Sequence, residues 1–484
     1  MSLQEPVFQF PIAFDDPGSG RRRGLHEQLR AAILEQRLPA GAELPSTRRV
    51  AEGYGVARNT VIAAYDLLIA EGYVLPRKGA KAVVADIATR RPLKARPLSA
   101  GLEDPRINPL WRTPFLAGAT ARDVAARSFR LGVPEHRHFP HDVWRRLSAQ
   151  SLRAWSRTGF SYPPSEGIAE LREAIAQHVA FARAVVCKAD DIVVTSGAQQ
   201  AFDLLARLLV TPGRTRIAFE EPGYPPVRAA FAAAGAQLVS IPVDDEGLCV
   251  ECLPDDVRVI SVTPSHQSPT GVALSMRRRL ALIEFARARD AVILEDDYDG
   301  EFRFGTRPLD ALQTLDRDGL VFYIGTFSKS LFPALRKGFV VAPAWARKAL
   351  VTVKHCTDSH SDAIAQSVLA AFIRDGHLAR HVRRMRPVYA ERREALLDGL
   401  RRHLDAWLEP IPSEAGLHLA ARVRDPALAP TLFAKARECT PGAQSIAEYA
   451  SAPPTHPALS FGYGIIDAKD IAPALRRLAL ALTA

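Results

Sequence analysis

The stretch "YIGTFSKSLFPALRKGF", from Tyr323 to Phe339, decides how the larger part of this chain folds. An apolar strand pattern stops at Thr-Phe-Ser-Lys, and Arg336 follows Lys329 seven residues later. In sheets that alternate with helices, binding sites form where strands end and loops begin. Lys329 is therefore either an ordinary surface lysine or an amine placed to hold a carbonyl compound covalently.

Strand-like and helical segments alternate along the chain from about Ser128 onward. The strand-like runs include "DIVVTSG", "TRIAFEEPGY", "RVISVTPSH" and "AVILEDDYD", and helical runs such as "AQQAFDLLARLLV" separate many of them. This alternation predicts an α/β fold with a mainly parallel central sheet covered by helices.

Several polar residues at the predicted strand ends are suited to binding a phosphate group. The run "SGAQ" brings Ala198 and Gln199 to the start of a helix, where free backbone N–H groups and the positive helix end favour an anion. Thr326, Ser328 and Arg336 would add hydroxyl and guanidinium donors.

Other strand ends supply what an aromatic cofactor with a carbonyl group needs. Tyr224 offers an aromatic face, Asp296 a carboxylate for a protonated ring nitrogen, and Lys329 an amine. With the phosphate donors, these groups form the set that pyridoxal 5′-phosphate requires. Neither a G-x-G-x-x-G after a strand nor a G-x-x-x-x-G-K-[ST] loop is present. The histidines of "HRHFPH" have no carboxylates at matching spacing, so we expect no metal site.

The motifs of this region resemble those of fold-type I aminotransferases, over roughly residues 120–484. They are "YPPSEGIAELREAIAQHV", "VTSGAQQAFDLL", "SPTG", "EDDYDGEFRF" and "GTFSKSLFPALRKGF". The resemblance implies that Lys329 forms the Schiff base (the internal aldimine), that Asp296 pairs with the pyridine nitrogen, and that Tyr224 stacks on the ring. Tyr298 would hydrogen-bond the phenolic oxygen. The phosphate would lie among Ala198, Gln199, Thr326, Ser328 and Arg336.

Two positions depart from the pattern of that superfamily. Ser268 stands before Pro-Thr-Gly in place of an Asn, so a shorter and weaker donor faces the phenolic oxygen and Tyr298 takes more of the task. In "ALSFGYG", Ser460 stands where aminotransferases place an Arg that clamps the substrate carboxylate, and no Arg occurs from residue 438 to residue 475. Unless an Arg from elsewhere substitutes, we expect little or no transamination. The effector is then expected to be either a compound without a carboxylate or pyridoxal phosphate alone.

The beginning of the chain has a different, basic character. Residues 20–100 contain 15 Lys and Arg against 7 Asp and Glu, which accounts for most of the net charge of +10. A basic segment of this kind usually faces a polyanion, and nucleic acid is the first candidate. In "GLHEQLRAAILEQ", the apolar Leu25, Leu29, Ile33 and Leu34 predict one face of a helix.

The pattern that follows predicts a winged helix-turn-helix. "LPAGAELPSTRRVAEGYG" reads as a turn and a short helix capped by Ser46, "VARNTVIAAYDLLIAEGY" as a third helix, and "YVLPRKGAKAVVA" as two short strands joined by a basic turn. The first turn of the third helix can reach base edges or phosphates in the major groove. The candidate DNA-binding residues are Ser46, Arg48, Arg49, Arg58, Asn59, Thr60, Arg77 and Lys78.

This head resembles the DNA-binding domain of the GntR family of bacterial regulators. We expect a winged helix-turn-helix domain over residues 20–85, a basic Pro-rich linker over 86–125, and an aminotransferase-like effector domain over 126–484. The combination resembles the MocR subfamily, which implies a head-to-tail homodimer that binds promoter DNA. The resemblance also implies an effector that is a small amine, an amino acid or pyridoxal phosphate itself.

Three interpretations of function stay open at this point. The first is a pyridoxal-phosphate-dependent transcriptional regulator, the second an aminotransferase with an accessory DNA-binding head, and the third a DNA-binding protein whose body serves only for dimerisation. Five cysteines form no regular framework and no apolar run approaches the length of a membrane span. We therefore expect a reduced, cytoplasmic protein without membrane contact.

Overall fold

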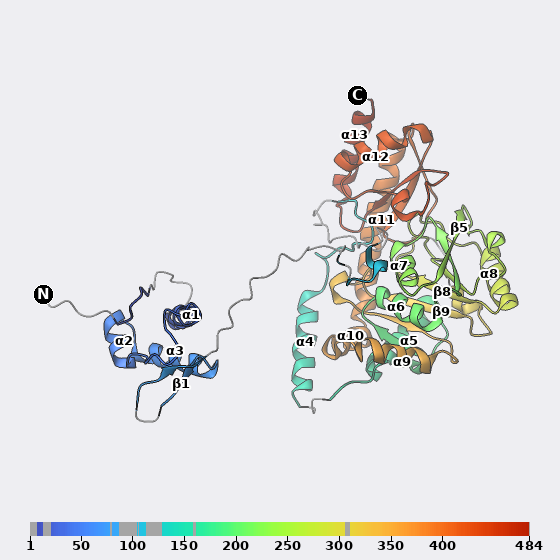
Figure 1. Cartoon of the computed structure of the whole chain (residues 1–484). Coiled ribbons are helices and arrows are strands. Elements are labelled where there is room, and N and C mark those ends of the chain that lie inside the picture. The colour runs from blue at the N-terminus through green and yellow to red at the C-terminus, as the bar shows by residue number, and fades with distance from the viewer. Residues whose placement is uncertain are drawn as a thin grey trace. The chain divides into compact units, whose positions relative to one another are not determined.

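The structure is a computed structural model, and it describes residues 7–12, 21–77, 80–86, 104, 106–112, 128–157, 161–304 and 310–483. The chain divides into two compact units, Met1–Arg106 and Ile107–Ala484 (Figure 1). We call the first unit the head and the second the body, and describe each by itself.

The head contains three helices followed by a two-stranded antiparallel hairpin. The elements are α1 (Arg21–Leu34), α2 (Thr47–Tyr54), α3 (Arg58–Ala70), β1 (Val74–Leu75) and β2 (Val83–Val84). Leu25, Leu29 and Ile33 are buried as predicted, whereas the predicted inward position of Leu34 is wrong, because its side chain is 53% exposed at the end of α1. This order of elements is a winged helix-turn-helix.

A short segment before the first helix also belongs to the core of the head. Phe8 and Phe10 are buried there, and the ring of Phe8 stacks on Tyr54 of α2 at a centroid distance of 6.2 Å. Both residues precede the range 20–85 that the sequence predicted for this domain.

The body is built on an eight-stranded sheet with the strand order β3-β10-β9-β8-β7-β4-β5-β6. Only β10 and β6 run antiparallel to their neighbours. The predicted mainly parallel sheet is confirmed. Its strands are β3 (Ile192–Thr195), β4 (Arg216–Glu221), β5 (Gln237–Asp244), β6 (Gly247–Leu248), β7 (Val259–Val262), β8 (Val292–Asp297), β9 (Val321–Thr326) and β10 (Gly338–Val341).

Helices cover both faces of this sheet, because its strands are apolar on both faces. Along β9, Phe322 and Ile324 pack into the core beneath α6 (Ala198–Leu209), α7 (Pro225–Ala233) and α9 (Arg347–Asp358). The alternate residues Val321 and Tyr323 face the opposite side. That side is covered by α5 (Ala169–Arg183) and α8 (Met276–Arg289).

A second, antiparallel sheet lies in the C-terminal part of the body, with the strand order β11-β12-β14-β13. In Figure 1, α12 and α13 lie with this part, and the long helix α11 runs from it toward the larger sheet. The elements are α4 (His141–Trp155), α10 (Ala363–Arg374), α11 (His377–His403), β11 (Leu408–Pro410), β12 (His418–Val423), α12 (Ala429–Cys439), β13 (Gln444–Ser445), β14 (Ala458–Gly462) and α13 (Ala468–Thr483). In the described part of the chain, no helix combines the length and apolar character that crossing a membrane requires.

Candidate functional site

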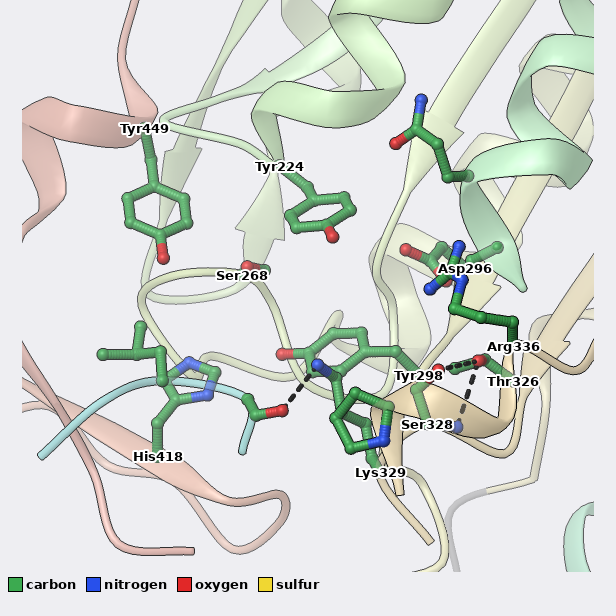
Figure 2. A pocket seen from close by; sticks show the side chains of 15 residues that line it. Tyr224, Ser268, Asp296, Tyr298, Thr326, Ser328, Lys329, Arg336, His418 and Tyr449 are labelled. Atoms are coloured by element: carbon green, nitrogen blue, oxygen red, sulfur yellow. Dashed lines mark hydrogen bonds between the residues drawn. The ribbon is translucent and has the colours of Figure 1, made fainter. Parts of the chain in front are cut away.

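A cavity of about 230 Å³ opens in the body where strands β3, β8 and β9 end (Figure 2). These strands run parallel to one another, so their carboxyl ends meet at one edge of the sheet. All ten residues predicted to contact the cofactor line this cavity. They are Ala198, Gln199, Tyr224, Ser268, Asp296, Tyr298, Thr326, Ser328, Lys329 and Arg336.

Lys329 follows β9 and points into the cavity. Its Nζ donates a hydrogen bond of 2.7 Å to the carbonyl oxygen of Gly132. Burial lowers the pKa of Lys329, while the carboxylates of Asp299 and Asp296 oppose the shift and the charges of Arg336 and Arg130 add to it. A lysine in such surroundings loses its proton more readily than an exposed one, as Schiff-base chemistry requires.

Asp296 lies near the end of β8 with one carboxylate oxygen unsatisfied. Its Oδ1 is buried and has no hydrogen-bond partner in the structure. Burial, followed by the negative charge of Asp297, raises the pKa of Asp296 to about 8. The neighbouring Asp297 is compensated differently, because Arg183 Nε and the Tyr323 hydroxyl donate to its Oδ2 at 2.6 and 2.7 Å. Of the two, Asp296 is therefore the carboxyl group without a hydrogen-bonded cation beside it.

One end of the site collects anion-binding groups. Helix α6 begins at Ala198, so the first backbone N–H groups of the helix, which have no acceptor within it, face this end. Arg336 lies against the preceding turn, where its Nη2 donates to Ser196 O at 2.9 Å. Gly197 permits this approach, since a Cβ there would lie 2.9 Å from that nitrogen.

The hydroxyl groups of Thr326 and Ser328 complete the anion-binding end. Thr326 Oγ1 donates to Ser328 Oγ at 3.0 Å, and the backbone N–H of Ser328 donates to Thr326 Oγ1 at 3.2 Å. Both side chains are buried and line the cavity. The bonds hold the two hydroxyl groups side by side, beside the start of α6.

Tyrosines form much of the remaining wall. Figure 2 shows Tyr224 and Tyr449 on one side of the cavity, with Lys329 and His418 on the other. Burial raises the pKa of Tyr224 to about 12, so its ring is neutral near pH 7. The hydroxyl of Tyr298 lies 3.1 Å from Nδ1 of His266 and donates to the backbone carbonyl of His266 at 2.9 Å.

Five residues that line the cavity were missed by the sequence reasoning. Gly132 precedes the large sheet by sixty residues, and Tyr449 and His418 come from the C-terminal part of the chain, so no local motif connects them with Lys329. A turn glycine such as Gly132, with φ +69°, cannot be told from sequence to carry a functional carbonyl group. The five are Leu131, Gly132, Pro333, His418 and Tyr449.

Ser460 is buried on β14, and its hydroxyl donates to the carbonyl of Pro269 at 2.9 Å. Pro269 follows Ser268, which lines the cavity, so Ser460 lies beside the site at the place where the sequence comparison expected an arginine. Among the described residues that line the cavity, Arg336 is the one arginine, and it lies at the anion-binding end.

The candidate DNA-binding residues lie at the starts of α2 and α3 and on the hairpin of the head. Ser46 caps α2 by accepting a hydrogen bond from the Arg49 N–H at 3.3 Å. Arg58 begins α3, and its Nε donates to Thr47 Oγ1 at 3.4 Å. The side chains of Arg48, Arg49, Arg58, Asn59 and Arg77 are exposed, Thr60 is half-buried, and Lys78 lies outside the described residues.

The donor set of the cavity fits pyridoxal 5′-phosphate. The unsatisfied Oδ1 of Asp296 matches a protonated ring nitrogen, and the helix start with Ser328 and Arg336 matches a phosphate. Lys329 Nζ lies in the same cavity and provides the amine.

Comparison with known proteins agrees with both units. The family described as aminotransferase class I and II matches residues 129–440, and the gntR family of bacterial regulatory proteins matches residues 22–84. The kynurenine aminotransferase of Pyrococcus horikoshii, solved in complex with PMP, is 27% identical, with a TM-score of 0.68 over 74% of this chain and 90% of its own.

Two relatives that are regulators by name each cover about four fifths of the chain. The probable rhizopine catabolism regulatory protein MocR of Rhizobium meliloti is 40% identical over 83% of this chain and 81% of its own length. The HTH-type pyridoxine biosynthesis transcriptional regulator PdxR of Corynebacterium glutamicum is 32% identical over 81% of each.

Fold and site together define a helix-turn-helix transcriptional regulator with an aminotransferase-like body. The chain belongs to the MocR subfamily of GntR-type regulators.

Proposed function

We propose that this chain is a cytoplasmic transcriptional regulator that binds promoter DNA through its head and senses a small molecule through pyridoxal phosphate held at Lys329. The sensed molecule is pyridoxal phosphate itself, a small amine or an amino acid. As in the subfamily pattern, the working unit is a head-to-tail homodimer. The observation that carries the proposal is that one cavity collects an amine, an uncompensated carboxylate and an anion-binding helix start in a chain with a GntR-type head.

Each wall of the cavity has a separate task in holding the cofactor. When bound, pyridoxal phosphate supplies a carbonyl group that condenses reversibly with primary amines. Lys329 offers such an amine, and its lowered pKa increases the neutral, nucleophilic fraction near neutral pH. Asp296 pairs with the ring nitrogen and keeps it protonated, while Arg336 and the start of α6 bind the phosphate.

The aromatic residues orient the ring of the cofactor. Tyr224 would stack on one face of the ring, and Tyr298, assisted by Ser268, would hydrogen-bond the phenolic oxygen. In the structure the Tyr298 hydroxyl donates to the backbone carbonyl of His266, so its proton would turn from that carbonyl toward the phenolic oxygen when the cofactor binds.

The head would read DNA with its third helix. Arg58, Asn59 and Thr60 occupy the first turn of α3, which is the part of a recognition helix that contacts base edges. Arg48 and Arg49 would contact a backbone phosphate, and Arg77 would contact DNA from the hairpin, as would Lys78, which lies outside the described residues. An effector changes DNA affinity only if it binds one conformation of the dimer more tightly than the other.

A second candidate function is an aminotransferase with an accessory DNA-binding head, favoured by the match of the body to aminotransferase class I and II. Ser460 in place of the carboxylate-binding arginine speaks against efficient turnover of amino acids.

One pair of assays separates the two functions. The full-length protein, with and without pyridoxal phosphate, is titrated into a fluorescent duplex that the wild-type protein has selected from random sequence. The same preparation is incubated with a panel of α-amino acids and a 2-oxo acid acceptor. The regulator predicts a cofactor-dependent or amine-dependent change in DNA affinity and negligible turnover. Steady-state transamination with unchanged DNA affinity would establish the enzyme instead.

A further inference from the structure

We propose that the effector is a primary amine that carries a hydroxyl group and no carboxylate, and that His418 binds the hydroxyl end. This inference rests on the sensing function proposed above and narrows the class of molecule sensed. It assigns a recognition role to a buried histidine beside the position where aminotransferases place their carboxylate-binding arginine.

The position of His418 follows from the register of the small sheet. His418 on β12 pairs with Gly462 of β14, and Ala420 pairs with Ser460. Directly paired residues, and residues two apart on one strand, lie on the same face of a sheet, so His418 and Ser460 share a face. Ser460 is taken up by its hydrogen bond to Pro269, whereas His418 lines the cavity (Figure 2).

Both histidines are buried and keep unsatisfied ring nitrogens. His418 is 3% exposed and His266 is 1% exposed, and their ring centroids lie 4.3 Å apart. The Nε2 atoms of both rings have no hydrogen-bond partner in the structure. Buried polar atoms are nearly always paired, so the unpaired Nε2 of His418, the one of the two histidines that lines the cavity, indicates a missing ligand.

Asp299 holds the neighbouring His266 in place and is itself fully engaged. Its two oxygens lie 3.1 and 3.0 Å from Nδ1 of His266, and one of them accepts the backbone N–H of Leu417 at 3.2 Å. The hydroxyl of Tyr298 also approaches Nδ1 of His266. The carboxylate and this nitrogen are therefore used within the protein, which leaves Nε2 of His418 for a ligand.

The electrostatics of this wall disfavour a carboxylate. Burial and the neighbouring His266 lower the pKa of His418 well below its usual range, so its ring is neutral near pH 7. A carboxylate placed against this ring would be desolvated without a positive charge from His418, and the carboxylate of Asp299 lies 3.0 Å from the adjacent His266. Arg336 cannot compensate it, because the phosphate of the cofactor takes that guanidinium.

A hydroxyl group meets the same wall favourably. His418 already donates a ring N–H to the backbone carbonyl of Pro269, so its unpaired Nε2 is an acceptor to which a ligand hydroxyl can donate. The amine at the other end of the molecule would lie near Lys329, whose charge also influences His418. An amino alcohol thus satisfies the unpaired nitrogen without burying a charge at this end.

Matched pairs of amines test the inference directly. The full-length protein is first saturated with pyridoxal phosphate, and its visible absorption band is recorded. It is then titrated with 3-amino-1-propanol against β-alanine, and with 4-amino-1-butanol against 4-aminobutyrate. The members of each pair share the amine and the chain length. We expect each amino alcohol to shift the band with a dissociation constant at least about tenfold lower than that of its amino acid. The alcohol gains one hydrogen bond, whereas the amino acid buries one unpaired charge.

Two variants locate the recognition in the cavity. His418→Leu should weaken amino alcohol binding at least about tenfold and remove the preference within each pair. His381→Leu is the matched control, because His381 is another buried histidine with an unpartnered ring nitrogen but does not line the cavity. His381→Leu should leave the titrations with amino alcohols and with amino acids unchanged.

Each outcome decides between the proposals. Equal binding, a preference for the amino acids, or no response to either member of a pair in protein that holds pyridoxal phosphate overturns this inference alone. A preference for amino acids that disappears in Arg130→Gln would show that Arg130 supplies the carboxylate contact instead. Protein that never acquires the visible band overturns the proposed function and this inference together.

Discussion

Nζ of Lys329 donates a 2.7 Å hydrogen bond to the carbonyl oxygen of Gly132, a residue that lies 197 positions earlier in the chain. Gly132 has φ +69°, and a Cβ on it would lie 2.6 Å from Nζ and 3.3 Å from Cε of Lys329. The amine at the centre of the site is thus positioned by a segment that no motif connects with it. The close approach requires glycine.

Gly132→Ala should therefore weaken cofactor loading. The added methyl group displaces the Lys329 amine, and the positive φ adds strain on the order of 1 kcal/mol. Gly213→Ala is the control, because Gly213 has φ +72° but nothing within 4 Å of the added Cβ. Thermal unfolding should show a similar loss for both variants, while spectroscopic titration with pyridoxal phosphate should show reduced affinity for Gly132→Ala only. Equal affinities of the two variants for pyridoxal phosphate would contradict the role of Gly132 in positioning the Lys329 amine.

Asp296→Asn should change how the stability of the cofactor-free protein depends on pH. The pKa of Asp296 is raised from 3.8 to about 8, so the folded state retains a proton that the unfolded state loses. Its stabilising contribution is full below about pH 4 and is lost as the pH rises through 8. Relative to the variant, wild-type protein should lose at least about 1 kcal/mol of unfolding free energy between pH 5 and pH 8.

Chemical denaturation at the two pH values measures this difference. The exposed Asp255→Asn serves as the control and should show no such trend relative to wild type. Asp296→Asn should also bind pyridoxal phosphate more weakly, because a neutral amide does not hold the ring nitrogen protonated. A pH dependence identical to that of wild type would mean that Asp296 is charged in the folded protein without its cofactor.

Arg336→Gln should discriminate between pyridoxal phosphate and pyridoxal, which lacks the phosphate. Loss of a hydrogen bond to a charged group costs about 1.5–3 kcal/mol, so affinity for the phosphorylated form should fall roughly 10- to 100-fold. Affinity for pyridoxal should stay close to that of wild type. Fluorescence titration with both compounds measures the two constants, and an equal loss for both would place the phosphate elsewhere.

Arg58→Ala should weaken DNA binding without affecting the cofactor. If Arg58 contacts a base edge, the loss should be about 1–3 kcal/mol on the selected duplex and smaller on random DNA. Arg30→Gln is a suitable control. Arg30 contacts Tyr73, which follows the last turn of α3, whereas Arg58 begins that helix. Anisotropy titrations at one fixed salt concentration compare the variants. An Arg58→Ala protein that binds the selected duplex like wild type would exclude the proposed docking of α3.

The ten candidate cofactor-binding residues could be predicted as a group because they sit in short motifs at strand ends. Once the alternating pattern predicts a parallel sheet, residues such as Asp296 and Lys329 must meet at one edge of it. His418 and Tyr449 could not be found in this way, because they reach the cavity from the small sheet and the segment before β14. Their approach depends on how the C-terminal part packs against the large sheet.

The head shows the same limit on a smaller scale. Periodicity identified the buried Leu25 and Leu29. It could not tell that Leu34, the last residue of α1, is exposed. Phe8 and Phe10 precede every recognisable helix signal, yet they pack in the same core. A long-range contact made by two aromatic residues leaves no periodic pattern in the sequence.

The central claim, that Lys329 holds pyridoxal phosphate, is tested most directly by the visible absorption spectrum of the protein titrated with that compound. Lys329→Ala is compared with wild type, and Lys348→Ala, which removes an exposed lysine of α9, is the control. A saturable visible band in wild type and Lys348→Ala that is absent from Lys329→Ala is the predicted result. A wild-type protein without the band, or a Lys329→Ala protein that retains it, would contradict the account.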